Sequence, residues 1–378
     1  MSANDAAHGG PDAHGPLRPV PDTGSLPVSL ISSIDPVLRD VLVTSLLLER
    51  PGMLALRYDV DAEHGALRRV LGDAERVIDD SLVELDHPCV SCAMREDAIP
   101  LLARLAGESR WDGLLLAPPI SADPEVVVRT ILPGRQGWHL GASAAVVDTR
   151  TAVHDLLEDD TLAERGLQWA DGDERAVGEA LAAQIEYADL LVLDGADGAA
   201  RELIEHLRAP EQQVAASMHT LHPKTLLLGR HSRARAEARR DPRRVSPYGG
   251  PTAHGTWTLD LSSDRPFHPD RLLEHIEELG AGRLRGRGRF WVPDRPGTIC
   301  QWDGAGGQVS IGAIADAGRD LPTTRLVVTG VGPADAERVR RAFGCILLTP
   351  EEWADGLAPW LGVEDRLAPW LGEREAAA

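Results

Sequence analysis

Residues 26 to 40, Leu26-Pro-Val-Ser-Leu-Ile-Ser-Ser-Ile-Asp-Pro-Val-Leu-Arg-Asp, decide the fold of this chain. The first seven form an apolar run that predicts a strand, and a helical pattern then extends from Pro36 to Arg50. Further apolar runs alternate with helical patterns, at 53–58, 113–117, 144–148 and 189–194. This rhythm predicts an α/β domain over residues 26–229, with a mostly parallel sheet and helices on both faces.

A second, smaller unit is expected at residues 254–356. Its helix begins at Asp270 and is followed by alternating strand patterns, which together indicate an α+β domain. The apolar run Cys345-Ile-Leu-Leu predicts one more strand. Because Cys300 and Cys345 both lie in apolar strand patterns, we expect both in the core.

Three segments fall outside these two domains. Residues 1–25 are rich in Gly, Pro, His, Asp and Ala without an apolar core, which predicts a disordered tail. Residues 230–253 are arginine-rich and are expected to form a linker. The tail at 357–378 contains Leu-Ala-Pro-Trp-Leu-Gly twice, and we expect it to pack or dock through Trp360 and Trp370.

The composition indicates a cytoplasmic protein without a membrane span. Four cysteines in 378 residues are too few for a disulfide scaffold, and no apolar run approaches the ~20 residues that a bilayer requires. The net charge of −20 argues against wholesale nucleic-acid binding. The arginines from Arg230 to Arg244 depart from this balance and are either a solvated segment or an arm for RNA phosphates.

The turn after the first strand lacks the groups of a phosphate-binding loop. Such a loop needs glycines whose N–H groups converge, a lysine for the β- and γ-phosphates, and a Ser or Thr for magnesium. None occupies its place between Ser33 and Asp40. Asp35 followed by Pro36 instead predicts a helix N-cap with proline at the first helical position. A carboxylate there would repel a phosphate, so GTP binding in the usual mode is not expected.

A cysteine pair, Cys89-Val-Ser-Cys92, lies between a strand-like stretch and a helical pattern. Thiolates three residues apart can bind one zinc ion or close into a disulfide. His87 is the nearest candidate for a third zinc ligand. Zinc binding, a redox pair and structural thiols all remain open from the residues alone.

The chain resembles the CobW-type GTPases, which handle zinc or cobalt as metallochaperones. The resemblance covers about residues 27–356 and is carried by four stretches in the second unit and one in the first. These are Arg265-Pro-Phe-His-Pro-Asp-Arg, Gly288-Arg-Phe-Trp-Val-Pro-Asp-Arg-Pro, residues 302–307, Ile346-Leu-Leu-Thr-Pro-Glu-Glu-Trp, and Gln184-Ile-Glu-Tyr-Ala-Asp-Leu-Leu-Val-Leu. It implies a P-loop-NTPase-like first domain and a CobW C-terminal-type second domain.

The family's nucleotide motifs are eroded in this chain. Arg39 falls where the phosphate lysine is expected, Asp123 is what remains of the magnesium motif, and Asp197 is what remains of the guanine-specificity motif. If a nucleotide binds, the resemblance implies that Arg39 contacts phosphate and Asp197 reads guanine. Ser91 replaces the middle cysteine of the family's Cys-x-Cys-Cys motif. Asp123 and Asp197 are otherwise expected as helix caps or turns.

Loss of the nucleotide motifs with retention of two cysteines is similar to one CobW-like branch. Its members recruit a ribosome hibernation factor to the small ribosomal subunit when zinc is scarce. The first hypothesis is therefore a non-catalytic, zinc-responsive adaptor. The alternatives are a GTP-binding zinc metallochaperone with an atypical nucleotide site, and a thiol–disulfide switch at Cys89 and Cys92.

Overall fold

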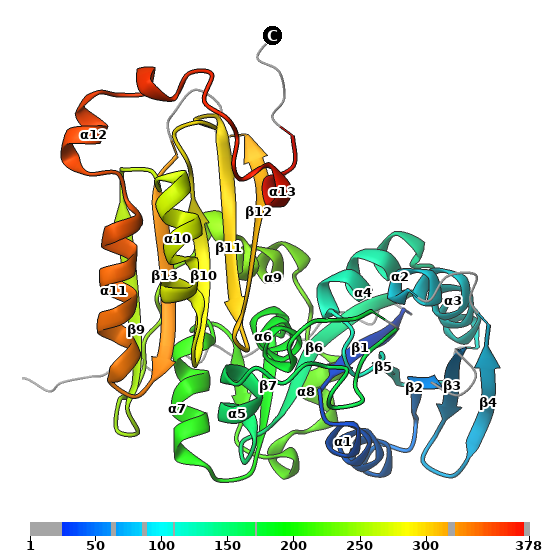
Figure 1. Cartoon of the computed structure of the whole chain (residues 1–378). Helices are drawn as coiled ribbons and strands as arrows, with labels where there is room; N and C mark the ends of the chain where they lie inside the picture. Colours follow the sequence, from blue (N-terminus) through cyan, green and yellow to red (C-terminus); the bar gives the residue numbers. More distant parts are fainter. Residues whose placement is uncertain are drawn as a thin grey trace, which may run out of the picture.

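The computed structural model describes residues 25–61, 66–84, 89–108, 110–170, 172–316 and 322–373. These ranges form an eight-stranded sheet and a five-stranded sheet, each with its own helices (Figure 1). The tail predicted at the N-terminus, apart from Ser25, and the candidate ligand His87 lie outside the described residues.

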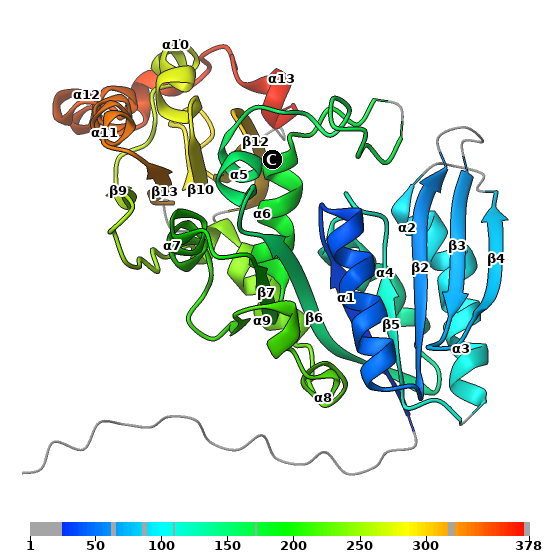
Figure 2. The same cartoon turned by 90° about the horizontal axis from the view of Figure 1, so that it is seen from below.

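The larger sheet has the strand order β4-β3-β2-β5-β1-β6-β7-β8. All neighbouring pairs from β2 to β8 are parallel, while β3 and β4 extend one edge as an antiparallel pair beside β2 (Figure 2). The strands are β1 (Leu26–Ser32), β2 (Met53–Asp61), β3 (Ala66–Gly72), β4 (Val77–Val83), β5 (Gly113–Ala117), β6 (Trp138–Asp148), β7 (Leu190–Asp194) and β8 (Gln213–Ala215).

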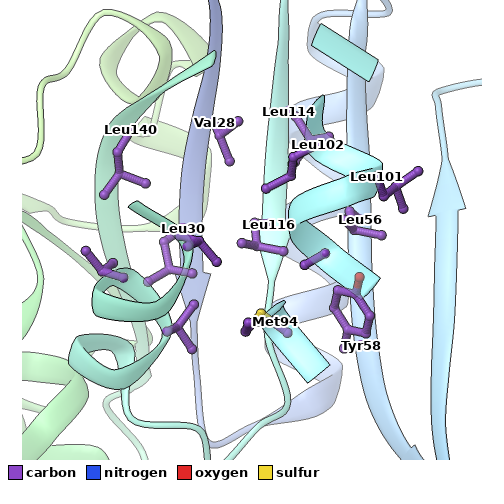
Figure 3. Close-up of a cluster of buried hydrophobic side chains, with 14 of the residues drawn as sticks. Val28, Leu30, Leu56, Tyr58, Met94, Leu101, Leu102, Leu114, Leu116 and Leu140 are labelled. Atoms are coloured by element: carbon purple, nitrogen blue, oxygen red, sulfur yellow. The ribbon is translucent and has the colours of Figure 1, made fainter. Parts of the chain in front are cut away.

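Helices cover both faces of this sheet because its central strands are apolar on both sides. In β1, Leu30 joins one buried cluster and the next residue, Ile31, joins the cluster on the opposite face. Figure 3 shows the first of these clusters, in which Leu30 and Leu116 face helical side chains such as Leu102. One face carries α1 (Pro36–Glu49) and α8 (Pro223–Leu227), and the other carries α2 (Val90–Ala93), α3 (Ile99–Gly107), α4 (Pro124–Ile131), α5 (Ala152–Leu157), α6 (Val177–Tyr187) and α7 (Gly198–Leu207).

The smaller sheet is antiparallel, with the strand order β12-β11-β10-β13-β9. Two antiparallel-packed helices, α10 (Pro269–Gly280) and α11 (Ala334–Ile346), lie together on one face (Figure 1). The predicted fold class, a mostly parallel α/β domain followed by a smaller α+β domain, is therefore confirmed. The strands are β9 (Thr256–Ser263), β10 (Leu284–Phe290), β11 (Thr298–Ala305), β12 (Gln308–Asp316) and β13 (Thr324–Val331).

Strand β10, Leu284-Arg-Gly-Arg-Gly-Arg-Phe290, has two chemically different faces. Leu284 and Phe290 lie in the core beneath the helices, and the glycine at 286 leaves room for Trp302, whose indole nitrogen would lie 3.2 Å from an added Cβ. The arginines of β10 alternate with these residues, so they lie on the opposite face of the strand. Arg285 and Arg287 are buried against the larger domain, so the polar face of β10 forms part of the contact between the domains.

The arginine-rich segment contains helix α9 (Arg233–Arg240) and a short turn, η4 (Pro242–Arg244). Ala236 is fully buried, and the helix packs against α6 and α4. This part of the predicted linker thus belongs to the helical layer of the larger domain. Five of its arginines are exposed, so RNA contact stays a prediction; they are Arg230, Arg233, Arg235, Arg243 and Arg244.

The end of the chain differs from expectation at one cysteine and at the second repeat. Cys345 is exposed within α11, so the strand predicted at Cys345–Leu348 is wrong, whereas Cys300 is buried in β11 as predicted. In the second Leu-Ala-Pro-Trp-Leu-Gly copy, Leu367 is fully buried in the core of the smaller domain, whereas Trp370 is 53% exposed, so this copy packs through leucine and not through its tryptophan. In the first copy, Trp360 packs edge-on against His268. This tail also contains α12 (Pro350–Ala354), η5 (Ala358–Trp360) and α13 (Ala368–Leu371).

Across the described ranges, every helix is too short or too polar to cross a bilayer.

Candidate functional site

The turn that leads into α1 satisfies its own helix end. The carboxylate of Asp35 accepts hydrogen bonds from the backbone N–H groups of Val37 and Leu38, at 2.8 and 2.9 Å. The Ser33 hydroxyl donates to the carbonyl of Val146 and accepts from the N–H of Asp35. The predicted N-cap is confirmed, and the N–H groups that would contact a phosphate are already bonded to a negative group.

Arg39 is committed to the interior of the larger domain. Its side chain is only 1% exposed. The guanidinium donates to the carboxylate of Asp59 at 2.5 Å and to the carbonyl of Pro118 at 3.2 Å, and it forms an ion pair with Asp40 at 2.9 Å. These contacts direct the guanidinium between the carboxyl ends of β2 and β5. The prediction that Arg39 contacts a nucleotide phosphate stays a prediction, and it would require those partners to be released.

The other two motif remnants act as helix caps. Asp123 caps α4 by accepting from the N–H of Glu125 at 2.8 Å, and Asp197 caps α7 by accepting from the N–H of Ala200 at 2.8 Å. Asp123 is also bound by both terminal nitrogens of Arg240, at 2.8 and 2.9 Å. Asp197 is exposed, and no arginine within the described ranges pairs with it. Of the two, only Asp197 remains accessible for a base, as the resemblance implies.

Cys89 and Cys92 lie together at the first turn of α2. The sulfur of Cys89 accepts a hydrogen bond from the backbone N–H of Cys92 at 3.1 Å, so Cys89 is the N-cap of this helix. Both thiols are free and half-buried. The hydrogen bond with Cys89, burial and the nearby Glu96 raise the pKa of the Cys92 thiol. The turn therefore presents two soft donors to solvent from one short segment.

The helix beyond the cysteines is wound irregularly. A π-helical turn, η1 (Met94–Ala98), joins α2 to α3, and such turns are frequent at functional sites. Asp97 in this turn accepts from the Tyr58 hydroxyl at 2.6 Å and is paired with Arg69 of β3. Figure 3 shows Tyr58 and Met94 at the same end of the core cluster. Burial and Asp97 raise the pKa of Tyr58, which keeps its hydroxyl a donor that anchors the cysteine turn to the sheet.

Within the described ranges, no further metal ligands lie beside the two sulfurs. No group of three or more His, Cys, Asp or Glu side chains that could hold a metal occurs there. On the neighbouring helix α4, the hydroxyl of Thr130 lies 3.4 Å from that of Ser91. Zinc usually takes four ligands, and His87 stays the predicted third.

A charged cleft lies between the two domains. Two adjoining cavities of about 520 and 140 Å³ share Glu186, Arg240 and Asp303 in their walls. Glu186 is buried and bound by Arg285 at 2.9 and 3.1 Å. Although burial raises the pKa of Glu186, Arg285 and Arg287 together lower it below its usual range. The pair holds β10 of the smaller domain against α6 of the larger one.

The sequence does not predict the contact at the centre of this cleft, between Glu186 and Arg285. The alternation of Arg285 and Arg287 with small residues in β10 was the available signal, because it marks one charged face on a strand. Nothing local linked that face to Glu186, which lies 99 residues earlier in the chain. In the sequence, Arg240 is one arginine of the run from Arg230 to Arg244, and nothing distinguishes it from the others.

Two protein-family models match this chain, one in each domain. The model described as CobW/HypB/UreG, nucleotide-binding domain, matches residues 61–222. The model of the cobalamin synthesis protein cobW C-terminal domain matches residues 256–347. The two matched segments coincide with most of the larger and the smaller domain.

Two characterised relatives are similar over much of the chain. A zinc chaperone of Mycobacterium tuberculosis is 29% identical over 311 residues, which are 78% of this chain and 74% of that protein. The zinc-regulated GTPase metalloprotein activator 1 of Dictyostelium discoideum is 26% identical over 255 residues, or 61% of this chain. That match spans 54% of the Dictyostelium protein's own length.

Among solved structures, the zinc-bound YjiA GTPase of E. coli aligns with 85% of this chain and 99% of its own, at 16% identity. The TM-score of 0.37 is too low for a residue-by-residue comparison.

Proposed function

We propose that this chain, which joins a CobW/HypB/UreG nucleotide-binding domain to a CobW C-terminal domain, is a zinc chaperone of the CobW type with an atypical nucleotide site. Zinc is its cargo, bound through the sulfurs of Cys89 and Cys92. The observation that carries the proposal is the cysteine turn itself, where two free thiols lie at a half-buried helix end and the Cys89 sulfur accepts from the backbone N–H of Cys92. The relatives that are named for zinc support the choice of metal.

An incomplete ligand set suits a protein that passes its metal on. Two thiolates bind zinc strongly, and the remaining positions can be taken by His87, water or a ligand of the receiving protein. Since Ser91 stands where the family has a third cysteine, the site holds zinc less tightly than a three-thiolate site. The accessible turn allows a partner to approach the ion.

The α1 turn does not fit the phosphates of GTP in the way of a phosphate-binding loop. Asp35 places a carboxylate on the helix N–H groups, and Arg39 is held by Asp59 and Pro118 inside the domain. A triphosphate would meet a negative charge without a lysine. The proposed zinc transfer therefore includes no step through a nucleotide at this turn.

Zinc affinity tests the proposal. Competition with a zinc indicator is measured for the wild type and for Cys89→Ser, Cys92→Ser and Cys345→Ser. We expect one zinc per chain, an affinity loss of at least about 100-fold in the first two variants, and no change in the third, because loss of one thiolate removes at least about 2.7 kcal/mol of binding. Cys345 is the matched control because it is exposed in α11, far from α2 in the sequence. Equal affinities in all three variants would overturn the proposal.

GTP titration of the same samples measures whether the atypical site binds a nucleotide. Calorimetry with GTP and magnesium is expected to show no binding tighter than about 100 μM. Tighter binding that is lost in Asp197→Ala would revive guanine recognition through Asp197. Reversible formation of a Cys89–Cys92 disulfide within cellular potentials would instead favour the thiol–disulfide switch.

The second candidate function is a zinc-responsive adaptor for the small ribosomal subunit that brings a hibernation factor to it. The capped α1 turn favours this candidate, since an adaptor needs no nucleotide chemistry. Co-sedimentation with ribosomes from zinc-starved cells tests it. No association, with or without zinc, would eliminate the adaptor while leaving the zinc affinity measurement untouched.

A further inference from the structure

A basic pocket lies where the parallel strands of the larger sheet begin, at their amino-terminal ends. It is formed by the amino end of β6, the turn η2 (Leu132–Gly134) and the loop that precedes α9, and its volume is about 280 Å³. We use the name basic pocket for this cavity. Its polar lining consists of Arg135, His139, Arg230, His231 and Arg233, and none of the residues that line it in the described part of the chain is acidic. The α1 turn, by contrast, lies at the carboxyl edge of the same sheet.

The arginines of the basic pocket are poorly neutralised for a chain with a net charge of −20. Within the described ranges, neither Arg135 nor Arg230 forms an ion pair with a carboxylate. Arg233 contacts Glu237 at 3.2 Å, but that carboxylate is shared with Arg129 at 2.8 Å. The pocket therefore carries an excess of positive charge in a concave site.

The back wall of the basic pocket is rigid. His231 has a side chain only 1% exposed, with Nδ1 at 2.8 Å from the carboxylate of Asp189 and Nε2 at 3.2 Å from the Tyr187 hydroxyl. Asp189 also accepts from the N–H of Ser143 at 3.0 Å. Because this carboxylate is held behind His231, it does not neutralise the arginines at the mouth.

His139 adds a polar group to the side of the pocket. Its Nδ1 lies 3.2 Å from the hydroxyl of Ser25. Burial, and then repulsion from the neighbouring Arg230, lower the pKa of His139. An anion placed between Arg135 and Arg230 would relieve this repulsion and accept charge-assisted hydrogen bonds from both guanidiniums.

We propose that the basic pocket binds the phosphate group of a small phosphorylated molecule, held between the guanidiniums of Arg135 and Arg230 with Arg233 beside them. Neither the cysteine turn nor the α1 turn lines the basic pocket, so the proposal goes beyond zinc handling. The volume lies near the lower end of the range of small-ligand sites. Arginine is the residue best matched to phosphate oxygens.

An extended RNA strand fits the surrounding surface less well. A single strand needs a continuous basic groove along its backbone. In α9, however, Arg239 donates to the carbonyl of Tyr187 at 2.7 Å, and Arg240 binds Asp123. Both side chains turn into the protein, which interrupts the arginine run beyond the pocket.

Calorimetry of the full chain with inorganic pyrophosphate as the probe tests the proposal. Arg135→Gln and Arg230→Gln are compared with Arg235→Gln, an exposed arginine of α9 that does not line the pocket. We expect saturable binding by the wild type, weakened by at least about tenfold in each pocket variant and by less than about twofold in the control. Thermal unfolding of each variant confirms that it is folded.

Three results would overturn the proposal. One is equal weakening in Arg235→Gln, which would reduce the effect to general electrostatic attraction. Another is absence of saturable binding by the wild type. The third comes from an arm with single-stranded RNA: if RNA binds through Arg230 while pyrophosphate does not compete with it, the ligand is a nucleic acid and not a small phosphate.

Discussion

Two helix N-termini in the larger domain, α1 and α2, are capped by side chains of opposite chemical character. Asp35 caps α1 with a charged carboxylate that accepts two backbone N–H groups. Cys89 caps α2 with a thiol that accepts one, at 3.1 Å. The carboxylate closes its helix end to phosphate, whereas the weak sulfur cap can be given up to a metal ion. On the proposed function, the metal chemistry of this chain lies at the α2 turn and not at the α1 turn.

The largest expected effect is on zinc affinity, and it distinguishes the α2 cap from the α1 cap. The double variant Cys89→Ser/Cys92→Ser should lose at least about 1,000-fold in zinc affinity, because both thiolates are gone. Asp35→Ala should leave zinc affinity within about twofold of wild type. Indicator competition measures both, and a matching loss in Asp35→Ala would mean that the two turns form one site.

The next effect is on stability and concerns Arg39. Arg39→Met should lower the free energy of unfolding by about 3 kcal/mol, because Asp59 and Asp40 lose their buried partner. Denaturant titration measures this loss. If Arg39→Met were as stable as wild type while GTP binding fell, Arg39 would be a phosphate ligand and the α1 turn would be functional.

A smaller effect is expected at the α1 cap. Asp35→Ala removes the acceptor for two N–H groups and should cost about 1 kcal/mol of stability. Asp35→Asn is the matched control, since asparagine caps helices about as well as aspartate. Tighter nucleotide binding in Asp35→Asn would show that the carboxylate charge itself excludes phosphate.

The smallest effect is expected at the α2 cap in metal-free protein. Cys89→Ser should change the free energy of unfolding by less than about 0.5 kcal/mol, because serine is a better N-cap than a thiol. Thermal and denaturant unfolding with a chelator present measure this. A large destabilisation without metal would mark Cys89 as a structural thiol. Its cap would then be too important for stability to be given up to a metal ion.

The features that could be predicted from sequence depend on neighbours close in the chain. Asp35 contacts groups two and three residues ahead, and the strand pattern of β1 follows from its own side chains. The partners of Arg39 could not be predicted, because Asp59 and Pro118 reach it only through the pairing of β2 with β5. The same holds for the contact between Glu186 and Arg285, which joins separate domains.

At two further places the structure differs from the prediction because the local sequence pattern is ambiguous. The run Cys345-Ile-Leu-Leu is short and apolar, so periodicity could not distinguish the end of α11 from a strand. In α9 the charge run concealed a helix, since Ala236 is its only fully buried apolar residue. The arginines there bond to carbonyls and carboxylates of α6 and α4, which composition alone does not reveal.

The most direct measurement of the central claim is zinc-edge X-ray absorption spectroscopy on the full chain loaded with one zinc ion. We expect two sulfur neighbours at about 2.3 Å in the wild type, one in Cys92→Ser, and two in the control Cys345→Ser. A zinc shell of nitrogen and oxygen alone, or one unchanged in Cys92→Ser, would contradict it.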